Sequence, residues 1–399
     1  MNTSRNKLII LITVFIDIIG IGIIIPVIPF YVKSFGVSEI TVTWLFAIYS
    51  FLSLFSTPFL GGLSDKIGRR PILLASLATT CVGWLIFAMA GNIWMLFLGR
   101  AIDGLAAGNI STAQSYLVDI SATPKERTAN LGLIGMIFGL GLIIGPLLGG
   151  LLGTIQLALP FYVVGVMAGI NTLLAFKFLP ETLKTKSNQK LSLNPLTPFV
   201  KGLKNRLLRP SLLAFFIFGM AISIQQSIFA LYLDKGYNWN ELHSGIIFAA
   251  MGLLLAINQG VLIRQFWIKK FKEPDLEQYL FLGLAAGFAT LGVINITALI
   301  LGLLLVTLSQ SVLRVVMVSQ MAGNNLKDQG AILGISNSIM SLSMIIGPII
   351  AGPLFALNIC APYWSAAILA IAGFIVITAK RKLLAKIQLS PKTEILIPQ

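Results

Sequence analysis

Long apolar runs, separated by short polar segments, extend along almost the whole chain. Each run is about 20 residues long, which is enough for a helix to cross the ~30 Å hydrocarbon core of a bilayer. Backbone groups in lipid must find hydrogen-bond partners within their own segment, so such runs must be helical. The pattern predicts an all-α membrane protein with twelve transmembrane helices, at residues 7–31, 42–60, 71–90, 93–117, 130–153, 158–179, 211–233, 244–266, 278–295, 297–320, 330–354 and 361–379.

The longest polar interruption divides these runs into two groups of six. The segment LIIGPLLGG at 142–150 is closely repeated as MIIGPIIAG at 344–352, which indicates two pseudo-symmetric six-helix bundles. Duplicated helical halves are a common plan of transporters, with the substrate site between the halves. The predicted organisation is an N-terminal bundle (1–180), a cytoplasmic linker (181–210), a C-terminal bundle (211–380) and a cytoplasmic tail (381–399).

Basic residues outnumber acidic ones by 29 to 14, giving a net charge of +15 in a chain that is only 11% charged. Nearly all of the basic residues fall on one side of the predicted membrane, and the opposite loops carry only Lys33 and Lys235. Positive charge stays on the cytoplasmic side, so both termini are expected there. The basicity therefore indicates topology and contact with a lipid bilayer, and gives no reason to expect a nucleic acid partner.

Enzyme chemistry is not indicated. Cys81 and Cys360 lie far apart within apolar runs, and His243 is the single histidine, in a predicted external loop. The sequence contains no phosphate-binding loop, nucleophile–base pair or cluster with metal-ligand spacing. We expect no enzymatic activity, no metal and no cofactor.

The loop between the second and third runs reads GGLSDKIGRR (61–70) and places four charges in ten residues. Glycines allow a tight turn and a close helix approach, and Asp65 can accept hydrogen bonds from the neighbouring arginines. The pattern resembles the signature loop between helices 2 and 3 of the major facilitator superfamily. The resemblance implies a gating latch on the cytoplasmic side, made by Gly61, Asp65, Gly68, Arg69 and Arg70.

The fifth run carries glycines at intervals of four, and a proline. Glycines at this spacing clear one helix face for close packing, and proline interrupts the hydrogen-bond ladder. The pattern resembles the antiporter motif of exporters in the same superfamily, and so favours efflux over uptake. The residues concerned are Gly141, Gly145, Pro146, Gly149 and Gly150.

Three charged residues lie deep inside predicted helices of the N-terminal half. Asp17 is near the middle of the first run, where burial disfavours the charged form of a carboxylate. It is either a proton carrier, a partner for a cationic substrate, or an acid satisfied by neighbouring helices. Arg100 and Asp103 are one turn apart in a segment that resembles the helix 4 motif of proton-coupled exporters. They form either a neutralised structural pair or a proton-coupling device in which Arg100 tunes a carboxylate.

The N-terminal half as a whole resembles the drug:proton antiporter family, and within it the tetracycline-resistance-type efflux proteins of bacteria. The resemblance implies a monomer in the inner membrane of a bacterium that exchanges protons for its substrate. Tetracycline exporters of this group carry an acid in helix 3 and another in helix 9. The corresponding stretches, 79–84 and 280–294, contain none, so we expect a different exported compound.

The polar residues inside the remaining helices are candidates for binding substrate. Gln225 and Asn337 are the preferred ones, and Arg314 would either meet an anionic substrate or extend to the membrane interface. The full set of candidates is Asp17, Asn109, Gln114, Gln225, Gln310, Arg314 and Asn337.

The expected function is proton-coupled export of a small amphipathic or hydrophobic compound by alternating access. One alternative is transport of a specific metabolite, such as a sugar or an organic acid. Another, of a different class, is a receptor or assembly factor that keeps the fold without transporting.

Overall fold

The computed structural model describes residues 3–183, 208–322 and 329–388, and within these ranges it is helical with no strand. Ten of the helices are long and apolar enough to cross a membrane, which confirms the all-α membrane fold, while the count of twelve stays a prediction. The helices before residue 184 are α1 (Thr3–Ile24), α2 (Ile28–Lys33), α3 (Glu39–Ile67), α4 (Arg69–Ala88), α5 (Ile93–Leu105), α6 (Asn109–Asp119), α7 (Pro124–Ile155) and α8 (Leu159–Phe178). Those after residue 207 are α10 (Arg209–Tyr237), α11 (Glu241–Ile257), the π-helix η1 (Asn258–Trp267), α12 (Ile268–Lys270), α13 (Glu273–Leu291), α14 (Ile296–Ala322), α15 (Gln329–Leu357) and α16 (Ala361–Gln388).

The chain forms two compact units. Unit 1 consists of the described parts of Met1–Pro195, Gln226–Ala256 and Met344–Ile359, and unit 2 of the described parts of the remainder. The boundary passes through α10, through α15 and just before the last residue of α11, and also falls between α15 and α16. The predicted division into two six-helix bundles stays a prediction, and residues 184–207 of the predicted linker and 389–399 of the predicted tail lie outside the described residues.

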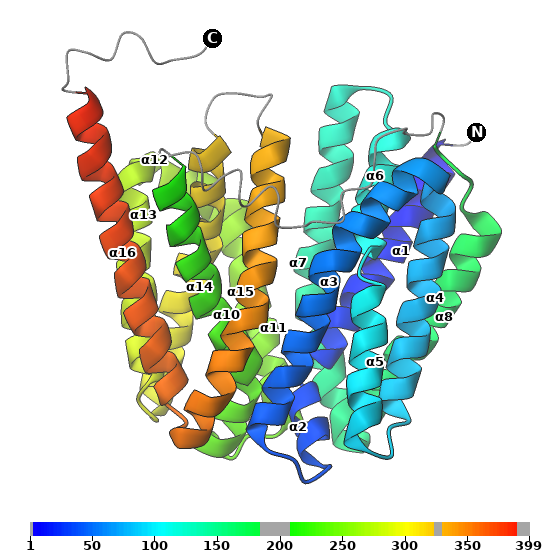
Figure 1. The fold of residues 1–399 in the computed structure, drawn as a ribbon, viewed down its shortest axis with the longest axis horizontal. Coiled ribbons are helices and arrows are strands. Elements are labelled where there is room, and N and C mark those ends of the chain that lie inside the picture. The colour runs from blue at the N-terminus through cyan, green and yellow to red at the C-terminus, as the bar shows by residue number, and fades with distance from the viewer. Residues whose placement is uncertain (1–2, 184–207, 323–328, 389–399) are drawn as a thin grey trace. The chain divides into compact units, whose positions relative to one another are not determined.

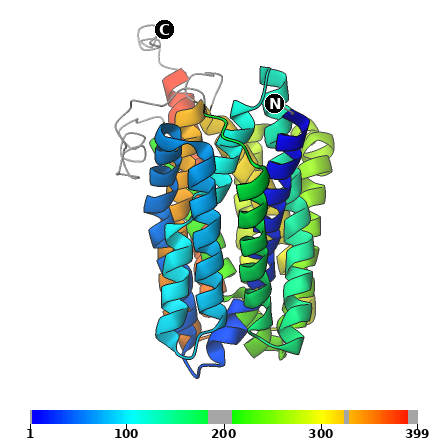
Figure 2. The same cartoon turned by 90° about the vertical axis from the view of Figure 1, so that its right-hand side faces the viewer.

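Unit 1 is built around α1, which runs between α7 and α8 (dark blue in Figure 2). Its apolar side chains are buried against α4, α6, α7 and α8, in a core that includes Ile10, Val14, Ile18, Leu77, Tyr116 and Ile137. We call the end of unit 1 where α1 begins the near end, and the end with α2 and the start of α3 the far end (Figure 1). Burial on several sides makes α1 the central helix of this unit.

Two predicted spans are interrupted in the structure. The span 7–31 ends at Ile24, because Pro26 and Pro29 cannot continue an α-helical hydrogen-bond ladder, and a short helix α2 comes after it. The span 93–117 is broken at residues 106–108 into α5 and α6 (cyan in Figure 1). The backbone carbonyls around this break are used by α3, whose Ser56 and Thr57 hydroxyls donate to Gly104 O at 2.7 Å and Ala107 O at 2.6 Å.

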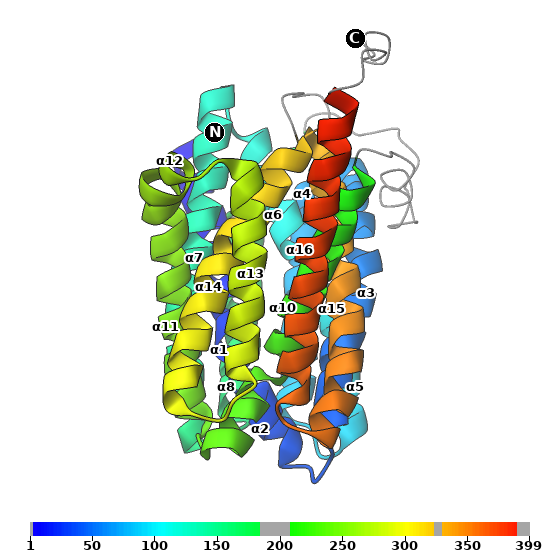
Figure 3. The same cartoon turned by 90° about the vertical axis from the view of Figure 1, so that its left-hand side faces the viewer.

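In unit 2, α13 lies between α14 and α16 (Figure 3). It begins at Glu273, before the predicted start at residue 278, and its first turns contain acids. Glu277 is 2% exposed, and Lys380 of α16 lies 3.5 Å from it. The stretch 280–294 has no acid, as expected, but a buried carboxylate precedes it by one turn.

Candidate functional site: buried charges of unit 1

Asp17 lies in the middle of α1 and is held by a side chain from α6. Asn109 Nδ2 donates to Asp17 Oδ1 at 3.1 Å, and the same nitrogen is 3.4 Å from Thr80 Oγ1 of α4. Asn109 is the first residue of α6, so the break at residues 106–108 places a helix N-terminus beside the carboxylate. The positive end of a helix dipole stabilises negative charge. The structure therefore joins two predicted site residues, Asp17 and Asn109, which are 92 positions apart in the chain.

Arg100 and Asp103 form a buried ion pair on α5, with Arg100 Nη1 3.1 Å from Asp103 Oδ2. The two residues are 5% and 8% exposed. Arg100 Nε donates to Leu45 O of α3 at 3.3 Å, and the guanidinium lies 4.3 Å from the centre of the Tyr49 ring. Asp103 is also within electrostatic range of Asp17. One acid of the cluster is thus neutralised by an arginine, and the other, Asp17, is paired only with a neutral amide among the described residues.

The close crossing of α4 and α5 positions this ion pair. A Cβ on Gly99 would lie 2.7 Å from Gly83 O, and one on Gly83 would lie 3.0 Å from Gly99 O. Only glycine fits at both positions, because a methyl group would push the two backbones apart. The pair of glycines brings Trp84 of α4 against the Arg100 guanidinium, 5.3 Å from its ring centre.

The glycines of α7 pack on two opposite partners within unit 1. On one side a Cβ on Gly145 would lie 2.6 Å from the Cα of Gly22 in α1. On the other side a Cβ on Gly150 would lie 3.3 Å from the Cα of Gly245 in α11. Of the predicted motif, Gly141, Gly145 and Gly149 face α1 and Gly150 faces α11. Pro146 lies against both helices, with its ring beside Gly22 of α1 and its carbonyl oxygen beside Gly245 of α11. The predicted close-packing role of these residues is thus visible, and their role in exchange stays a prediction.

At the near end, Arg69 is the centre of a charge cluster. Its guanidinium pairs with Asp65, and its Nε donates to Asp119 Oδ2 of α6 at 3.0 Å. Glu181, which lies just after α8, accepts from the backbone N–H of Arg69 at 2.9 Å and of Arg70 at 3.1 Å. These are free N–H groups at the start of α4, so Glu181 caps that helix.

The backbone turn between α3 and α4 explains the second glycine of the predicted latch. Gly68 has φ +126°, a value that disfavours other residues. A Cβ there would also collide with the Glu181 carboxylate. A Cβ on Gly61 would meet open space, so the structure shows no close helix contact that requires glycine at this position. Sequence reasoning missed Glu181, although its position directly after Pro180 marks a helix end.

At the far end, two ion pairs join α2 and α3 to the end of α10. Lys33 Nζ lies 2.5 Å from Asp234 Oδ2, and Lys235 Nζ lies 2.5 Å from Glu39 Oε1. The signs are exchanged between the pairs, because each of the two partner segments supplies one acid and one base. Lys235 also lies 5.6 Å from the ring centre of Phe355 in α15. The prediction missed these contacts, since the two basic residues were noted only for their side of the membrane.

The other predicted substrate residues are divided between the two units. Gln114 of α6 is exposed, whereas Gln225 of α10 is 3% exposed and its Nε2 has no partner among the described residues. Arg314 of α14 and Asn337 of α15 are exposed, and Gln310 is half-buried. The last four belong to unit 2. Their role in binding stays a prediction.

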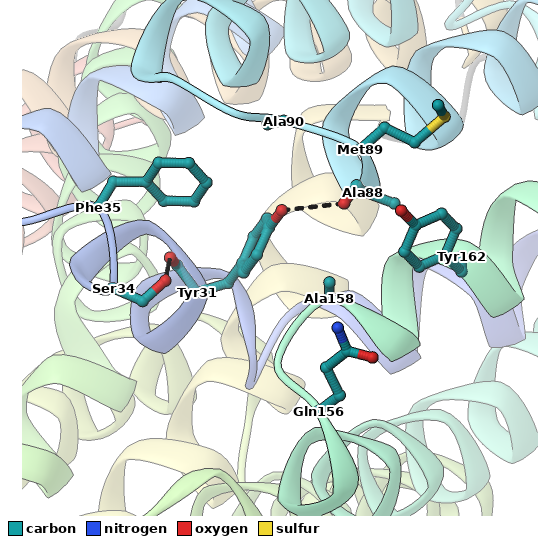
Figure 4. Close-up of a pocket in the computed structure, with 9 residues that line it drawn as sticks. All are labelled: Tyr31, Ser34, Phe35, Ala88, Met89, Ala90, Gln156, Ala158 and Tyr162. Atoms are coloured by element: carbon teal, nitrogen blue, oxygen red, sulfur yellow. Dashed lines mark hydrogen bonds between the residues drawn. The ribbon is translucent and has the colours of Figure 1, made fainter.

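A cavity of about 320 Å³ opens at the far end of unit 1 (Figure 4). None of the predicted site residues lines it. Tyr31 spans it and donates to Ala88 O at 3.0 Å. The other lining residues are Ser34, Phe35, Met89, Ala90, Gln156, Ala158 and Tyr162.

Helices long and apolar enough to cross a membrane, with charges buried among them, are typical of membrane transporters. The sequence pattern of the Major Facilitator Superfamily matches residues 10–274. The class H tetracycline resistance protein of Pasteurella multocida is 35% identical over 67% of this chain and 69% of its own length. Multidrug resistance protein 2 of Bacillus subtilis is 27% identical over 94% of each chain. The fold matches the crystal structure of the human organic anion transporter MFSD10, with a TM-score of 0.70 and 22% identity over 94% of this chain and 100% of that one.

The chain belongs to the Major Facilitator Superfamily. The predicted fold, the transporter class and the resemblance to efflux proteins are thereby confirmed.

Proposed function

We propose that the protein exports a small amphipathic or hydrophobic compound in exchange for protons. The observation that carries this proposal is the environment of Asp17, a half-buried acid in the central helix of unit 1 whose one described hydrogen bond comes from Asn109. An acid in such a place is costly to keep charged and is therefore suited to bind and release a proton. The tetracycline and multidrug resistance proteins among the relatives support export as the direction.

Transport would proceed by alternating access, with contacts at each end of unit 1 forming and breaking in turn. At the far end the contacts are the ion pairs Lys33–Asp234 and Glu39–Lys235. At the near end Asp65, Arg69 and Arg70 act as the latch. Most of the described basic residues of unit 1 lie toward its near end, so that end would face the cytoplasm. The protein would then work as a monomer in the inner membrane of a bacterium, with both termini inside.

The Arg100–Asp103 pair would assist the exchange, with Arg100 tuning the affinity of a carboxylate for its proton. Gain of a proton by Asp17 changes the net charge of this cluster, and the coupling requires that the change weaken substrate binding or favour one conformation. Asn109, Gln114, Gln225, Gln310, Arg314 and Asn337 are the polar residues proposed to contact the substrate.

Proton flux in liposomes tests this proposal. The full chain is reconstituted with a pH-sensitive dye inside, and lipophilic drugs, tetracycline among them, are added one at a time. A drug that is exported should cause proton movement, and Asp17→Asn should abolish it. Asp275→Asn, which changes an acid paired with Arg381 in unit 2, is the matched control and should transport normally.

If Asp17→Asn keeps substrate-dependent proton flux, Asp17 is not the proton carrier and the proposal fails. Asp65→Asn tests the latch separately, and should lower transport while leaving the amount of folded protein unchanged.

A second candidate is transport of a metabolite that carries an anionic group, such as an organic acid. It is favoured by Arg314, which is exposed on α14 and has no ion-pair partner among the described residues. In the same liposomes, flux with organic acids that is lost in Arg314→Gln, together with no response to lipophilic drugs, would select this alternative.

A further inference from the structure

In the side-chain amide of Asn109, the nitrogen has hydrogen-bond partners and the oxygen has none among the described residues. Its Nδ2 faces two oxygens, Asp17 Oδ1 at 3.1 Å and Thr80 Oγ1 at 3.4 Å. Its Oδ1 is buried and has no hydrogen-bond partner among the residues that the structure describes. A buried carbonyl oxygen without a donor is unfavourable, by about 1–3 kcal/mol in typical proteins. The position of this oxygen, on the same amide that holds Asp17, therefore calls for an explanation.

The two protonation states of Asp17 need opposite partners. An ionised carboxylate only accepts hydrogen bonds, and the Asn109 Nδ2 supplies one. A protonated carboxyl also has an O–H to donate. An unused acceptor is present on the same Asn109 amide, and half a turn about the last side-chain torsion exchanges its oxygen with its nitrogen. This torsion is broad and roughly two-fold in asparagine.

Thr80 suits both orientations of the amide. A hydroxyl can accept from Nδ2 in one orientation and donate to Oδ1 in the other, because its hydrogen rotates freely. The carboxyl, the amide and the hydroxyl can thus be hydrogen-bonded to one another in two ways, one for each orientation of the amide. Among the described residues, the charge of Asp17 acts through space on Asp103 and Tyr49, and Arg100 is engaged by Asp103.

We infer that Asn109 is a positioning residue that reverses its amide when Asp17 gains or loses a proton, with Thr80 as the partner that accommodates both orientations. The inference rests on the proposed function, since it requires Asp17 to exchange a proton. Asn109 is the first residue of α6, directly after the break at residues 106–108. The reversal would therefore act at the point where the segment formed by α5 and α6 is not helical. Proton binding would thereby reach α6 through a single side chain.

Infrared difference spectroscopy between high and low pH tests this inference on the full chain in liposomes. The carbonyl band of protonated Asp17 is identified as the band lost in Asp17→Asn. In Asn109→Ala this band should shift, because the protonated carboxyl loses its acceptor. Thr80→Val should also shift it, whereas Thr80→Ser, which keeps the hydroxyl, should leave it in place.

Asn171→Ala is the matched control. Asn171 lies on α8 and is 1% exposed. It donates at 3.0 Å to the carbonyl oxygen of Thr13 in α1, the helix that carries Asp17, and its Oδ1 has no hydrogen-bond partner among the described residues. Its removal disturbs packing on α1 to a similar degree, but it should not move the Asp17 band. Asn109→Ser serves as a second variant if Asn109→Ala does not fold, and a shift is expected there too.

The outcomes separate the two levels of the proposal. The spectra are compared between about pH 4 and pH 9, a range that covers both the ordinary pKa of a carboxyl group and the raised pKa of a buried one. If no carbonyl band is lost in Asp17→Asn over this range, Asp17 does not exchange a proton and the proposed function fails. A band that is lost in Asp17→Asn but stays in place in Asn109→Ala or Asn109→Ser overturns the role of Asn109 alone. A band that moves equally in Asn171→Ala would also overturn it, since general packing would then explain the shift.

Discussion

Lys33 at the end of α2 and Asp234 near the end of α10 are 201 positions apart in the chain, yet Lys33 Nζ donates to Asp234 Oδ2 at 2.5 Å. The side chains of the two residues are 32% and 29% exposed. Ion pairs with this much solvent contact contribute about 0.2–1 kcal/mol to stability. The contact is thus weak enough to break in each cycle of the proposed transport mechanism.

Reversal of one charge in this pair should lower transport without unfolding the protein. In Lys33→Asp two acids face each other, so we expect the transport rate to fall several-fold while the melting temperature changes by about 2 °C or less. The exchange Lys33→Asp with Asp234→Lys should recover most of the lost rate. Drug-dependent proton flux measures the effect, and Lys269→Asp, at an exposed lysine of α12, is the control. No recovery in the exchanged pair would show that the pair does not act as a contact.

The crossing of α1 and α7 should not tolerate a methyl group. A Cβ on Gly145 would lie 2.6 Å from the Cα of Gly22, so Gly145→Ala must separate the two backbones. Overpacking of this kind typically costs about 1–3 kcal/mol. Thermal unfolding in detergent should show a clear loss of stability. Gly135→Ala in the same helix, where the added methyl meets open space, should be neutral or slightly stabilising. Equal stability of the two variants would contradict the observed crossing.

The Arg100–Asp103 pair should show strong coupling in a double-mutant cycle. Replacement of one partner leaves the other charge buried alone, which costs about 3–5 kcal/mol. We expect Arg100→Met to be strongly destabilised, and the double variant Arg100→Met with Asp103→Asn to be more stable than Arg100→Met. Thermal unfolding of the wild type, of Arg100→Met, of Asp103→Asn and of the double variant gives the coupling energy. Additive effects would mean that the two charges do not depend on each other.

Glu181 should stabilise the start of α4. Its carboxylate accepts from two backbone N–H groups there, and the helix dipole adds to the attraction. We expect Glu181→Ala to lose about 1 kcal/mol of stability at low salt and less at high salt, because Glu181 is exposed and its charge is screened. Urea unfolding at two salt concentrations measures both effects. A loss that does not depend on salt would rule out the electrostatic part of the cap.

Features that depend on local pattern could be predicted from the sequence. Apolar runs of membrane length indicated the helices, and the spacing of three between Arg100 and Asp103 indicated their contact on one helix face. The break at residues 106–108 could not be predicted in this way, because Ala106, Ala107 and Gly108 continue the apolar run. Hydropathy measures the preference of a segment for lipid, whereas the carbonyls at this break are bonded by hydroxyl groups of α3, a distant segment.

Contacts between distant segments were also out of reach. The bonds from Asn109 to Asp17 and from Lys33 to Asp234 depend on how the helices pack, and a single sequence carries no signal for a particular pair. The start of α13 was missed for another reason. A run of charges at Glu273, Asp275 and Glu277 has the composition of a loop, and only burial of Glu277 beside Lys380 makes it part of the helix.

The backbone contact of Gly22 with Gly145 has a consequence for how this protein can evolve. Because the backbones of α1 and α7 touch at Gly22 and Gly145, a larger residue at either position would separate the two helices. The position of α1, which carries Asp17, is therefore fixed against α7. On the proposed function, selection for a new substrate would therefore act on positions such as Gln114, whose side chain is exposed. The exported compound could then change while the proposed proton carrier stays in place.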